Sequence, residues 1–284
     1  MTRYLVTGAA GMLGTDIVAA LAGRDVTALA RTDLDITDAA AVAHAVEGFD
    51  VVINTAAYTR VDDAETDEAA ALALNGTAVG NLATAAATHG ATLVHYSTDY
   101  VFDGEGTSPY DEYAAIGPRS AYGRTKAHGE RLALEANGDR THIIRTAWLY
   151  GEHGTSFPAT MLRLAGERET LAVVDDQVGQ PTWTADLAAQ TVALLDSGVP
   201  EGIWHGTNSG QGSWFDFARA VFENAGLDPE RITPTDSSQF VRPAPRPAYS
   251  VLGHDGWSAA GLIPLRDWRL ALGAAFATGA LGAS

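Results

Sequence analysis

Short strand-like runs alternate with alanine-rich helical stretches through the first half of this chain. Runs rich in Val, Ile, Leu and Tyr are expected to form strands at residues 3–7, 25–30, 50–54, 91–97 and 141–146. The intervening stretches are expected to form helices at residues 12–21, 39–47, 64–88 and 121–136. Successive strands joined through helices run parallel, because each helix returns the chain to the edge from which the next strand starts. The alternation therefore predicts an α/β fold built on a doubly wound parallel sheet.

A glycine-rich turn, VTGAAGMLG, connects the first expected strand to the first expected helix. Its three glycines, Gly8, Gly11 and Gly14, allow a pyrophosphate to approach the backbone closely. Met12 and Leu13 open the helix, whose free N–H groups attract an anion. In a strand–turn–helix context this spacing is typical of the dinucleotide-binding site of a Rossmann domain, and a plain tight turn is the alternative.

The end of the second strand bears on which dinucleotide binds. NAD-selective proteins place an acidic residue there, whereas this chain has Arg31, which suits a 2′-phosphate. Arg31 therefore favours NADPH and leaves NADH open, with a solvated surface arginine as the alternative. Asp35 and Ile36, in DLDITD, fit an adenine contact in which the carboxylate accepts from the exocyclic amine; a helix N-cap region is equally compatible.

Lys126 is the only lysine among the 18 basic residues of the chain. Tyr122 lies four residues earlier, so the phenol and the ammonium are expected on one helix face. A phenol is a poor proton donor near neutral pH unless a neighbouring cation lowers its pKa. A hydroxyl after the fourth strand, from Thr98 or Ser97, would hydrogen bond a substrate carbonyl. Thr98, Tyr122 and Lys126 are therefore the candidate catalytic residues.

The alternation weakens in the second half, where proline and glycine become frequent. Single strands are expected at 171–174 and 202–206, with helices between them. We expect residues 1–150 to form the NAD(P)-binding Rossmann domain, to which strands and helices around 171–205 return. Residues 151–284 are expected to form mainly a smaller, interleaved substrate-binding lobe.

The sequence resembles the dTDP-4-dehydrorhamnose reductase family of extended short-chain dehydrogenase/reductases. The resemblance spans residues 6–252 and rests on VTGAAGMLG, DLDITD, NTAAYTRVDDAE, STDYVFDG, SAYGRTKAHGE, RTAWLYG, SFPATMLRLA, VVDDQVGQPTW and RPAYSVL. It implies a catalytic role for Thr98, Tyr122 and Lys126, and a cofactor-lining role for Ala56, Ala57 and Tyr58. The substrate-binding residues that follow from it are Thr98, Asp99, Trp148, Gln177 and Arg246. Further shared positions are Asn75, Gly179, Pro181 and Pro247.

The same resemblance implies NAD(P)H-dependent reduction of the 4-keto group of dTDP-4-dehydro-β-L-rhamnose to dTDP-β-L-rhamnose. Relatives that dehydrate nucleotide sugars carry an Asp–Glu pair after the threonine, and here Tyr100 replaces the glutamate that would remove a proton. Two alternatives stay open: a nucleotide-sugar epimerase of the same superfamily, and a non-catalytic NAD(P)-binding regulatory subunit. Retention of Tyr122 and of the single lysine argues for catalysis.

Acidic residues outnumber basic ones by 35 to 18, which gives a formal net charge of −17. Nucleic acid is a poor partner for such a chain, because binding its phosphates needs clustered cations. The acid excess suggests a halophile-like surface adapted to high salt, where self-repulsion is screened. An ordinary acidic protein from a high-GC genome is an equal alternative.

No apolar run is long enough to span a membrane, and a strand is expected from Arg3 onward, which leaves no room for a signal peptide. We therefore expect no membrane association and a cytoplasmic location. The eight histidines and many acids show no ligand spacing, so no metal site is predicted. The expected partner is the nucleotide-sugar substrate, and a homodimer, which some family members form, is left open.

Overall fold

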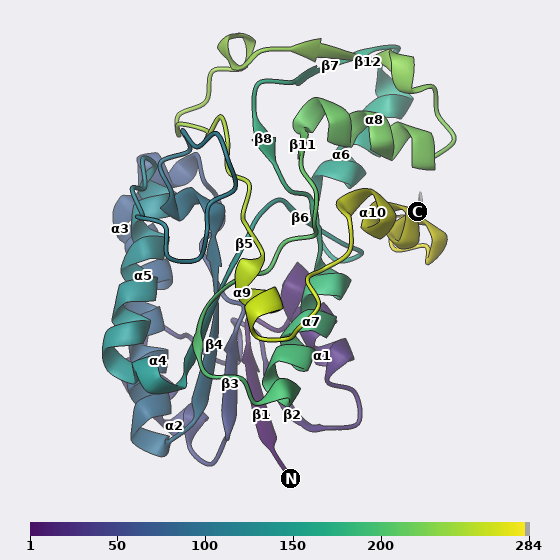
Figure 1. The fold of residues 1–284 in the computed structure, drawn as a ribbon. Helices are drawn as coiled ribbons and strands as arrows, with labels where there is room; N and C mark the ends of the chain where they lie inside the picture. The colour runs from purple at the N-terminus through teal and green to yellow at the C-terminus, as the bar shows by residue number, and fades with distance from the viewer. Residues whose placement is uncertain (282–284) are drawn as a thin grey trace.

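A computed structural model describes residues 1–281 and contains a six-stranded sheet in the order β2-β1-β3-β4-β5-β10 (Figure 1). All five strand pairs in it are parallel. The strands are β1 (Arg3–Thr7), β2 (Asp25–Leu29), β3 (Val51–Asn54), β4 (Thr92–Thr98), β5 (Thr141–Thr146) and β10 (Gly202–His205). The six strands expected at these places are confirmed to within about one residue at each end.

Helices cover both faces of this sheet, as Figure 1 shows. One face carries α1 (Met12–Ala20), α7 (Thr184–Ser197) and the short α9 (Asp255–Ala259), and the other carries α2 (Ala39–Val46), α4 (Ala78–His89) and α5 (Ala121–Asn137). Successive strand residues point to opposite faces, so Leu5 enters the core beneath α2 and α4, while Tyr4 and Val6 enter the core beneath α1 and α7. The predicted doubly wound α/β fold is confirmed.

The helix expected over 64–88 is confirmed from Glu68 onward, but it begins four residues later than expected and contains a π turn. The chain there forms a 3-10 turn, η1 (Asp63–Glu65), then α3 (Glu68–Leu72), then a π-helical turn, η2 (Ala73–Thr77), which leads into α4. Asp67 caps a new helix by accepting from the backbone N–H of Ala70 at 3.2 Å. The π turn then rotates Asn75 inward, where its side chain bonds the backbone of Tyr58. A π turn at such a place often marks a functional site.

A second body has a hydrophobic core of its own, rich in aromatic side chains such as Phe217, Phe222 and Trp268. Its helices are α6 (Phe157–Glu167), α8 (Trp214–Asn224) and α10 (Trp268–Ala277). Its two-stranded ladders are β7 (Leu171–Val174) with β12 (Ile232–Thr235), β6 (Leu149–Tyr150) with β9 (Thr182–Trp183), and β8 (Val178–Gly179) with β11 (Gly212–Ser213). The remaining short 3-10 turns are η3 (Asp99–Val101), η4 (Gly138–Arg140), η5 (Pro229–Arg231) and η6 (Ser237–Gln239).

The two bodies are interleaved in sequence. Of the segment 171–205, α7 and β10 lie on the large sheet, whereas β7 pairs with β12 away from it. Residues 244–252 then run back between β8 and the loop after β4: Ser250 N–H donates to the carbonyl of Val178, and Tyr249 N–H donates to that of Gly104. This returning segment therefore lies beside the carboxyl edge of the large sheet. Among the helices of residues 1–281, none combines the length and the apolar run needed to cross a bilayer.

Candidate active site

The glycine turn after β1 lies against the end of β3, where the strand order reverses between β1 and its two neighbours. Gly8 has φ +71°, and a Cβ there would lie 2.6 Å from the backbone nitrogen of Ala56. A Cβ on Gly14 would lie 2.4 Å from the carbonyl oxygen of Gly8. Gly11 caps α1 without any side-chain hydrogen bond, so the N–H groups of the first turn stay free for an anion. This cradle suits a dinucleotide pyrophosphate, because ligands of such sheets bind at the switch point.

The other residues of the first helical turn support the cradle. Leu13 is buried in the core beneath α1, whereas Met12 is half-buried and lies toward Gly151. Met12 thus borders the turn, and Leu13 fixes the helix to the sheet.

The segment after β2 carries Arg31, Asp35 and Ile36, which were expected to face the cofactor. Arg31 is exposed and close enough to Asp35 to contribute to lowering the pKa of that carboxyl, after the larger effect of hydrogen bonds from Thr37. Ile36, in contrast, is buried in the hydrophobic core, and its carbonyl accepts from Asn81 at 3.3 Å. Its side chain therefore anchors the loop, while Arg31 and Asp35 remain accessible to a ligand.

Ala56, Ala57 and Tyr58 follow β3 at the same edge, and Asn75 holds this stretch in place. Asn75 Oδ1 accepts from Tyr58 N–H at 2.8 Å, and Asn75 Nδ2 donates to the Tyr58 carbonyl at 3.0 Å. Asn75 is fully buried and also donates to the hydroxyl of Thr125 on α5 at 3.2 Å. The Asn75 side chain thus pairs with the backbone of Tyr58 and links residues 56–58 to the helix that carries Tyr122 and Lys126.

Thr98 and Tyr122 come together at the end of β4. Burial raises the pKa of Tyr122 to about 12, and the Thr98 hydroxyl acts in the opposite direction. The Tyr122 ring also packs edge-on against Tyr100, with 5.7 Å between centroids. Thr98 Oγ1 donates to Asp99 Oδ1 at 2.9 Å, and burial raises the pKa of Asp99 to about 6 despite opposing effects from the hydroxyls of Ser250 and Thr98. The Asp99 carboxyl therefore changes its protonation state closer to neutral pH than an ordinary aspartate does.

Lys126 lies on the same helix as Tyr122, but its amine turns into the protein. The side chain is 2% exposed, and Nζ donates to the carbonyl of Tyr96 at 2.5 Å and lies 3.2 Å from His95 Nε2. Burial lowers the pKa of Lys126 to about 8. The structure thus places the three candidate catalytic residues around the end of β4, with the lysine bonded to the strand rather than to the phenol.

Trp148 stands in a strained position beyond β5. Among residues 1–281 it is the one non-glycine residue with positive φ, at +47°. Its ring stacks on Trp214 with centroids 3.6 Å apart and 11° between planes, and a Cβ on Gly179 would lie 2.6 Å from Trp148 Cζ2. Backbone strain of this kind is found at ligand-binding sites, which fits the expected substrate contact. Gln177, near Gly179, donates to the hydroxyl of Ser237 at 2.8 Å.

Arg246 joins the returning segment to the large domain. Its guanidinium donates to Asp62 Oδ2 at 2.9 Å, and Asp62 Oδ1 accepts from the Ala244 N–H at 3.2 Å. Arg246 lines a cavity of about 160 Å³ together with Tyr100 and Ser120. It therefore lies beside the turn that follows Thr98, one side chain away from Tyr122.

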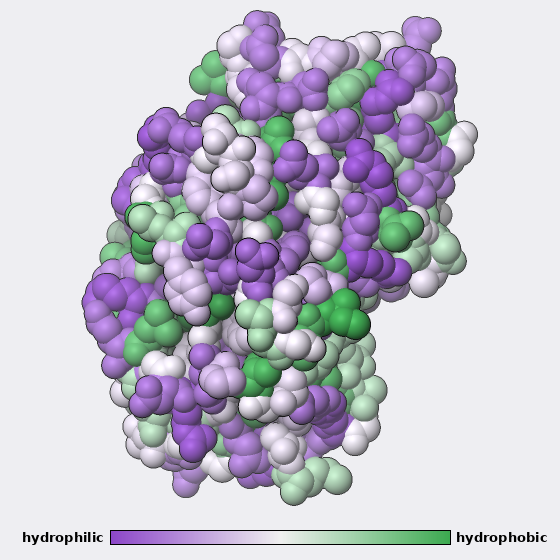
Figure 2. Space-filling model, viewed as in Figure 1, coloured by the Kyte–Doolittle hydropathy of each residue, from purple (hydrophilic) through white to green (hydrophobic). Residues whose placement is uncertain are grey.

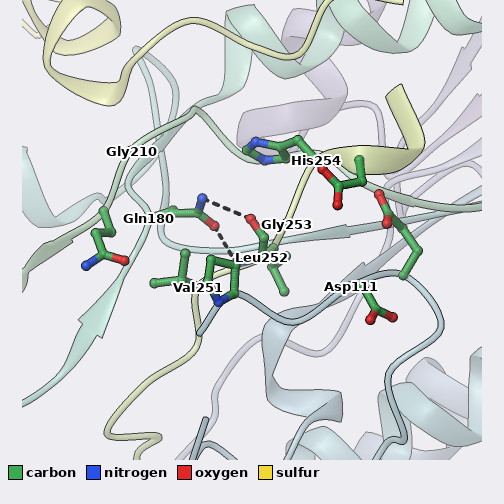
Figure 3. A pocket seen from close by; sticks show the side chains of 11 residues that line it. Asp111, Gln180, Gly210, Val251, Leu252, Gly253 and His254 are labelled. Carbon is green, nitrogen blue, oxygen red and sulfur yellow. Dashed lines mark hydrogen bonds between the residues drawn. The ribbon is translucent and has the colours of Figure 1, made fainter. Parts of the chain in front are cut away.

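A larger cavity of about 490 Å³ lies around residues 251–255, and none of the predicted site residues lines it (Figure 3). Gln180 faces Leu252 there: Oε1 accepts from Leu252 N–H at 2.8 Å, and Nε2 donates to the Leu252 carbonyl at 3.2 Å. This amide fixes the segment that carries Ser250 beside Asp99. Among residues 1–281, no three His, Asp or Glu side chains gather as a metal site would require.

Several residues that shape the site were not identified from sequence. Asn54 and His95 lie under Lys126, Asp62 pairs with Arg246, and Ser250 neighbours Asp99. Asp62 and Gln180 stand inside motifs already singled out, so their presence there was the available signal. Asn54 and Ser250 also stand inside such motifs, at the start of NTAAYTRVDDAE and within RPAYSVL, whereas His95 could only be found by aligning the strands.

A parallel sheet with a glycine turn at its switch point and a Tyr–Lys helix packed beside the fourth strand has the architecture of the NAD(P)-dependent short-chain dehydrogenase/reductases, and this protein is one of that class. The model of one family within it, described as the RmlD substrate binding domain, matches residues 2–280. The chain belongs to this family, the dTDP-4-dehydrorhamnose reductases.

Individual relatives agree with this assignment. The chain is 51% identical to the dTDP-4-dehydrorhamnose reductase of Streptomyces griseus, over 96% of this chain and 93% of that protein. It is 50% identical to the dTDP-4-keto-6-deoxy-D-glucose reductase of Streptomyces niveus, over 96% of both. The structure matches that of a dTDP-4-dehydrorhamnose reductase from Bacillus anthracis, solved in complex with NADP, with a TM-score of 0.94 and 36% identity over 98% of this chain and 100% of that chain.

Proposed function

We propose that this protein reduces the 4-keto group of dTDP-4-dehydro-β-L-rhamnose to give dTDP-β-L-rhamnose, with NADPH as the reductant. The observation that carries the proposal is the meeting of Thr98 and Tyr122 at the end of β4, next to the glycine cradle at the switch point. Membership of the reductase family supports the reaction, and the neighbouring NADP complex from Bacillus anthracis supports the cofactor. Arg31 and Asp35 are the residues that would face the adenosine end, and NADH is the second choice.

The residues of the chain have distinct roles in this reaction. Bound NADPH supplies a hydride to the keto carbon. Tyr122 donates its phenolic proton to the oxygen, while Thr98 would orient that oxygen by turning its hydroxyl proton from Asp99 Oδ1 toward it. Lys126, in its protonated form, provides the cation that lowers the cost of the phenolate. Trp148, Gln177 and Arg246 would contact the nucleotide sugar.

The test is loss of reduced-nicotinamide absorbance with NADPH and enzymatically generated dTDP-4-dehydro-β-L-rhamnose. Tyr122→Phe should lower kcat by about 10²-fold or more with NADPH affinity unchanged, because only the proton donor is removed. A parallel assay with dTDP-4-keto-6-deoxy-D-glucose, the substrate named for the Streptomyces niveus relative, checks the sugar.

A flat trace would contradict the proposal, and it would separate the two alternatives. Cofactor that copurifies and never leaves would point to an epimerase, whereas protein without cofactor or turnover would point to a regulatory subunit. A cytoplasmic location and a homodimeric assembly belong to the same proposal, and size-exclusion chromatography with light scattering tests the second.

A further inference from the structure

A chain of buried polar side chains runs beneath the catalytic helix and ends at Lys126, the one member to which the reaction proposed above gives a role. Thr7, Asn54 and His95 are direct register partners on three neighbouring parallel strands, β1, β3 and β4. Thr7 Oγ1 lies 2.8 Å from Asn54 Oδ1, Asn54 Nδ2 lies 3.1 Å from His95 Nδ1, and His95 Nε2 lies 3.2 Å from Lys126 Nζ. All four side chains are at most 2% exposed. Buried polar chains are costly unless each member has a partner, so the donors and acceptors can be assigned one by one.

The backbone fixes the direction of this chain at Asn54. Asn54 Oδ1 accepts a hydrogen bond from the backbone N–H of Ala56 at 3.1 Å, and a backbone N–H can only donate. The Asn54 amide therefore has one orientation, with its oxygen toward Ala56 and its nitrogen toward His95. Since that nitrogen can only donate, His95 Nδ1 must accept and carries no proton.

An imidazole that accepts at Nδ1 carries its single proton on Nε2, which is the atom that faces Lys126. An imidazolium is excluded in this arrangement, because both of its nitrogens donate. Burial, together with the charge of Lys126, holds the pKa of His95 well below its usual range, in agreement with a neutral ring. An ammonium at Lys126 would then place two donors against each other, since it has no lone pair.

We propose that His95 is a positioning residue for Lys126: its Nε2–H donates a hydrogen bond to Nζ and thereby stabilises the lysine as a neutral amine. The amine nitrogen accepts from His95 Nε2–H with its lone pair and donates one of its own hydrogens to the carbonyl of Tyr96. Lys126 is then a cation below its lowered pKa, as the proposed reaction requires, and a neutral amine above it. The consequence for turnover rests on the proposed function, but the protonation of the two side chains does not.

The charged groups around Lys126 agree with a lysine that has no anionic partner. Glu130, one turn further along α5, raises the pKa of Lys126, but its carboxylate is paired with Arg145 of β5 at 2.8 Å and 3.0 Å. On β4, the facing groups are His95 and the Tyr96 carbonyl. On α5, Tyr122 is the other titratable neighbour along the helix. Among residues 1–281, no carboxylate lies within ion-pair distance of Lys126.

The first experiment reads the tautomer directly, on the full chain without cofactor. Two-bond ¹H–¹⁵N correlation spectra of protein labelled with ¹⁵N-histidine and ¹³C-lysine distinguish the two neutral tautomers and the imidazolium. His95 is assigned by its dipolar contact with the labelled lysine. We expect the Nε2–H tautomer at neutral pH, and an Nδ1–H tautomer or an imidazolium would overturn the proposal.

The second experiment titrates the lysine. Its signal needs no assignment, because Lys126 is the only lysine of the chain. We expect the side-chain ¹³Cε shift to titrate with a midpoint near 8 in the wild type. His95→Gln should raise the midpoint, because a glutamine amide can rotate its oxygen to accept from an ammonium. An unchanged or lower midpoint in the folded variant would contradict the proposal.

His142 on β5 provides the matched control. It is also a buried histidine, and its Nδ1 accepts from Trp204 Nε1 at 3.1 Å, away from Lys126. His142→Gln should leave the lysine midpoint where it is, and an equal shift in both variants would count against a local effect. In the reductase assay, the alkaline limb of the pH profile should move upward in His95→Gln alone. Loss of reductase activity with the expected spectra would refute the proposed function and leave this inference standing.

Discussion

Lys126 shows why arginine and lysine differ at a single position. The amine occupies a closed space bounded by the Tyr96 carbonyl and His95 Nε2, both within 3.2 Å of Nζ. A guanidinium is larger, planar and permanently charged, so it neither fits this space nor accepts from His95. The retention of one lysine in a chain otherwise rich in arginine follows from this geometry.

We therefore expect Lys126→Arg to lower kcat by about 10²-fold or more, although arginine keeps the positive charge of the protonated lysine. Steady-state kinetics with NADPH and the keto sugar measure the effect, and thermal unfolding confirms that the variant is folded. Activity close to that of the wild type would show that the compact amine is not required.

Asp99 gives a pH-dependent contribution to stability. Burial raises its pKa from 3.8 to about 6, so between these values the folded state binds more protons than the unfolded state. The stabilisation from the protonated form is full below about pH 4 and is lost as the pH rises through 6. The shift corresponds to about 3 kcal/mol.

Asp99→Asn removes this proton linkage. The free energy of unfolding of the variant, measured with urea between pH 4 and 7.5, should fall less with rising pH than that of the wild type. Asp139, which is exposed, supplies the control Asp139→Asn. Parallel pH curves for wild type and Asp99→Asn would rule out a raised pKa.

The large sheet shows which elements can be predicted from a sequence. The positions of its strands follow from local hydrophobic runs, and their parallel direction follows from the alternation with helices. Both predictions are confirmed. The meeting of Asn54, His95 and Lys126 could not be predicted, because it depends on the register of strands 41 residues apart in sequence. The expectation that Lys126 and Tyr122 share a helix face held only for the backbone position, since the lysine side chain found partners on β4.

The π turn inside the expected helix over 64–88 has a similar cause. Alanine-rich composition favours an uninterrupted helix there, and local propensity is overridden by a tertiary contact. The π turn directs Asn75 to the backbone of Tyr58, 17 residues earlier. The sequence does not show that the backbone N–H and carbonyl of Tyr58 pair with the side chain of Asn75; this follows only from the folded structure.

The ladder of β8 and β11 places Gly179 under the Trp148 ring, so a substitution in β8 acts on a side chain that follows β5. Gly179→Ala would bring a methyl group to 2.6 Å from Cζ2 and force the ring off Trp214. If Trp148 contacts the sugar nucleotide, KM for that substrate should rise about tenfold, or about 1.4 kcal/mol, while NADPH affinity is kept. Tryptophan fluorescence reports the lost stacking.

Gly166 provides the comparison for this variant. It lies in α6 of the same body, has ordinary φ, and a Cβ there would meet nothing within 4 Å. Gly166→Ala should leave KM unchanged and slightly stabilise the helix. Equal kinetic effects in the two variants would show that the loss does not come from Trp148.

The whole molecule carries its acid excess on the surface. Figure 2 shows hydrophilic side chains over most of the visible face, with apolar ones scattered between them. Most ion pairs are exposed, whereas Arg145–Glu130 is buried with side chains 3% and 4% exposed. Salt weakens exposed pairs but also screens the repulsion of a net charge of −17.

The halophile hypothesis predicts that screening of repulsion prevails. Melting temperature should then rise by several degrees from dilute to molar potassium chloride, as differential scanning fluorimetry can measure. A flat or falling melting temperature would favour the ordinary acidic protein instead. An equal concentration of a neutral osmolyte serves as the control, because it stabilises folded proteins without screening charge.

The returning segment also determines when the molecule can become complete during its synthesis. Trp257 belongs to the core of one sheet face and Trp268 to the core of the second body. Gln180 holds Leu252, two residues after Ser250, which neighbours Asp99. Proteins generally fold from the N-terminus as the ribosome releases them. Here, a nascent chain that ends before residue 250 would hold a finished glycine cradle and an unfinished substrate side. Translation must therefore pass Trp257 before the core beneath α1 and α7 is complete, and Trp268 before the core of the second body is complete, whereas the buried members of the core beneath α2 and α4 all lie before residue 144.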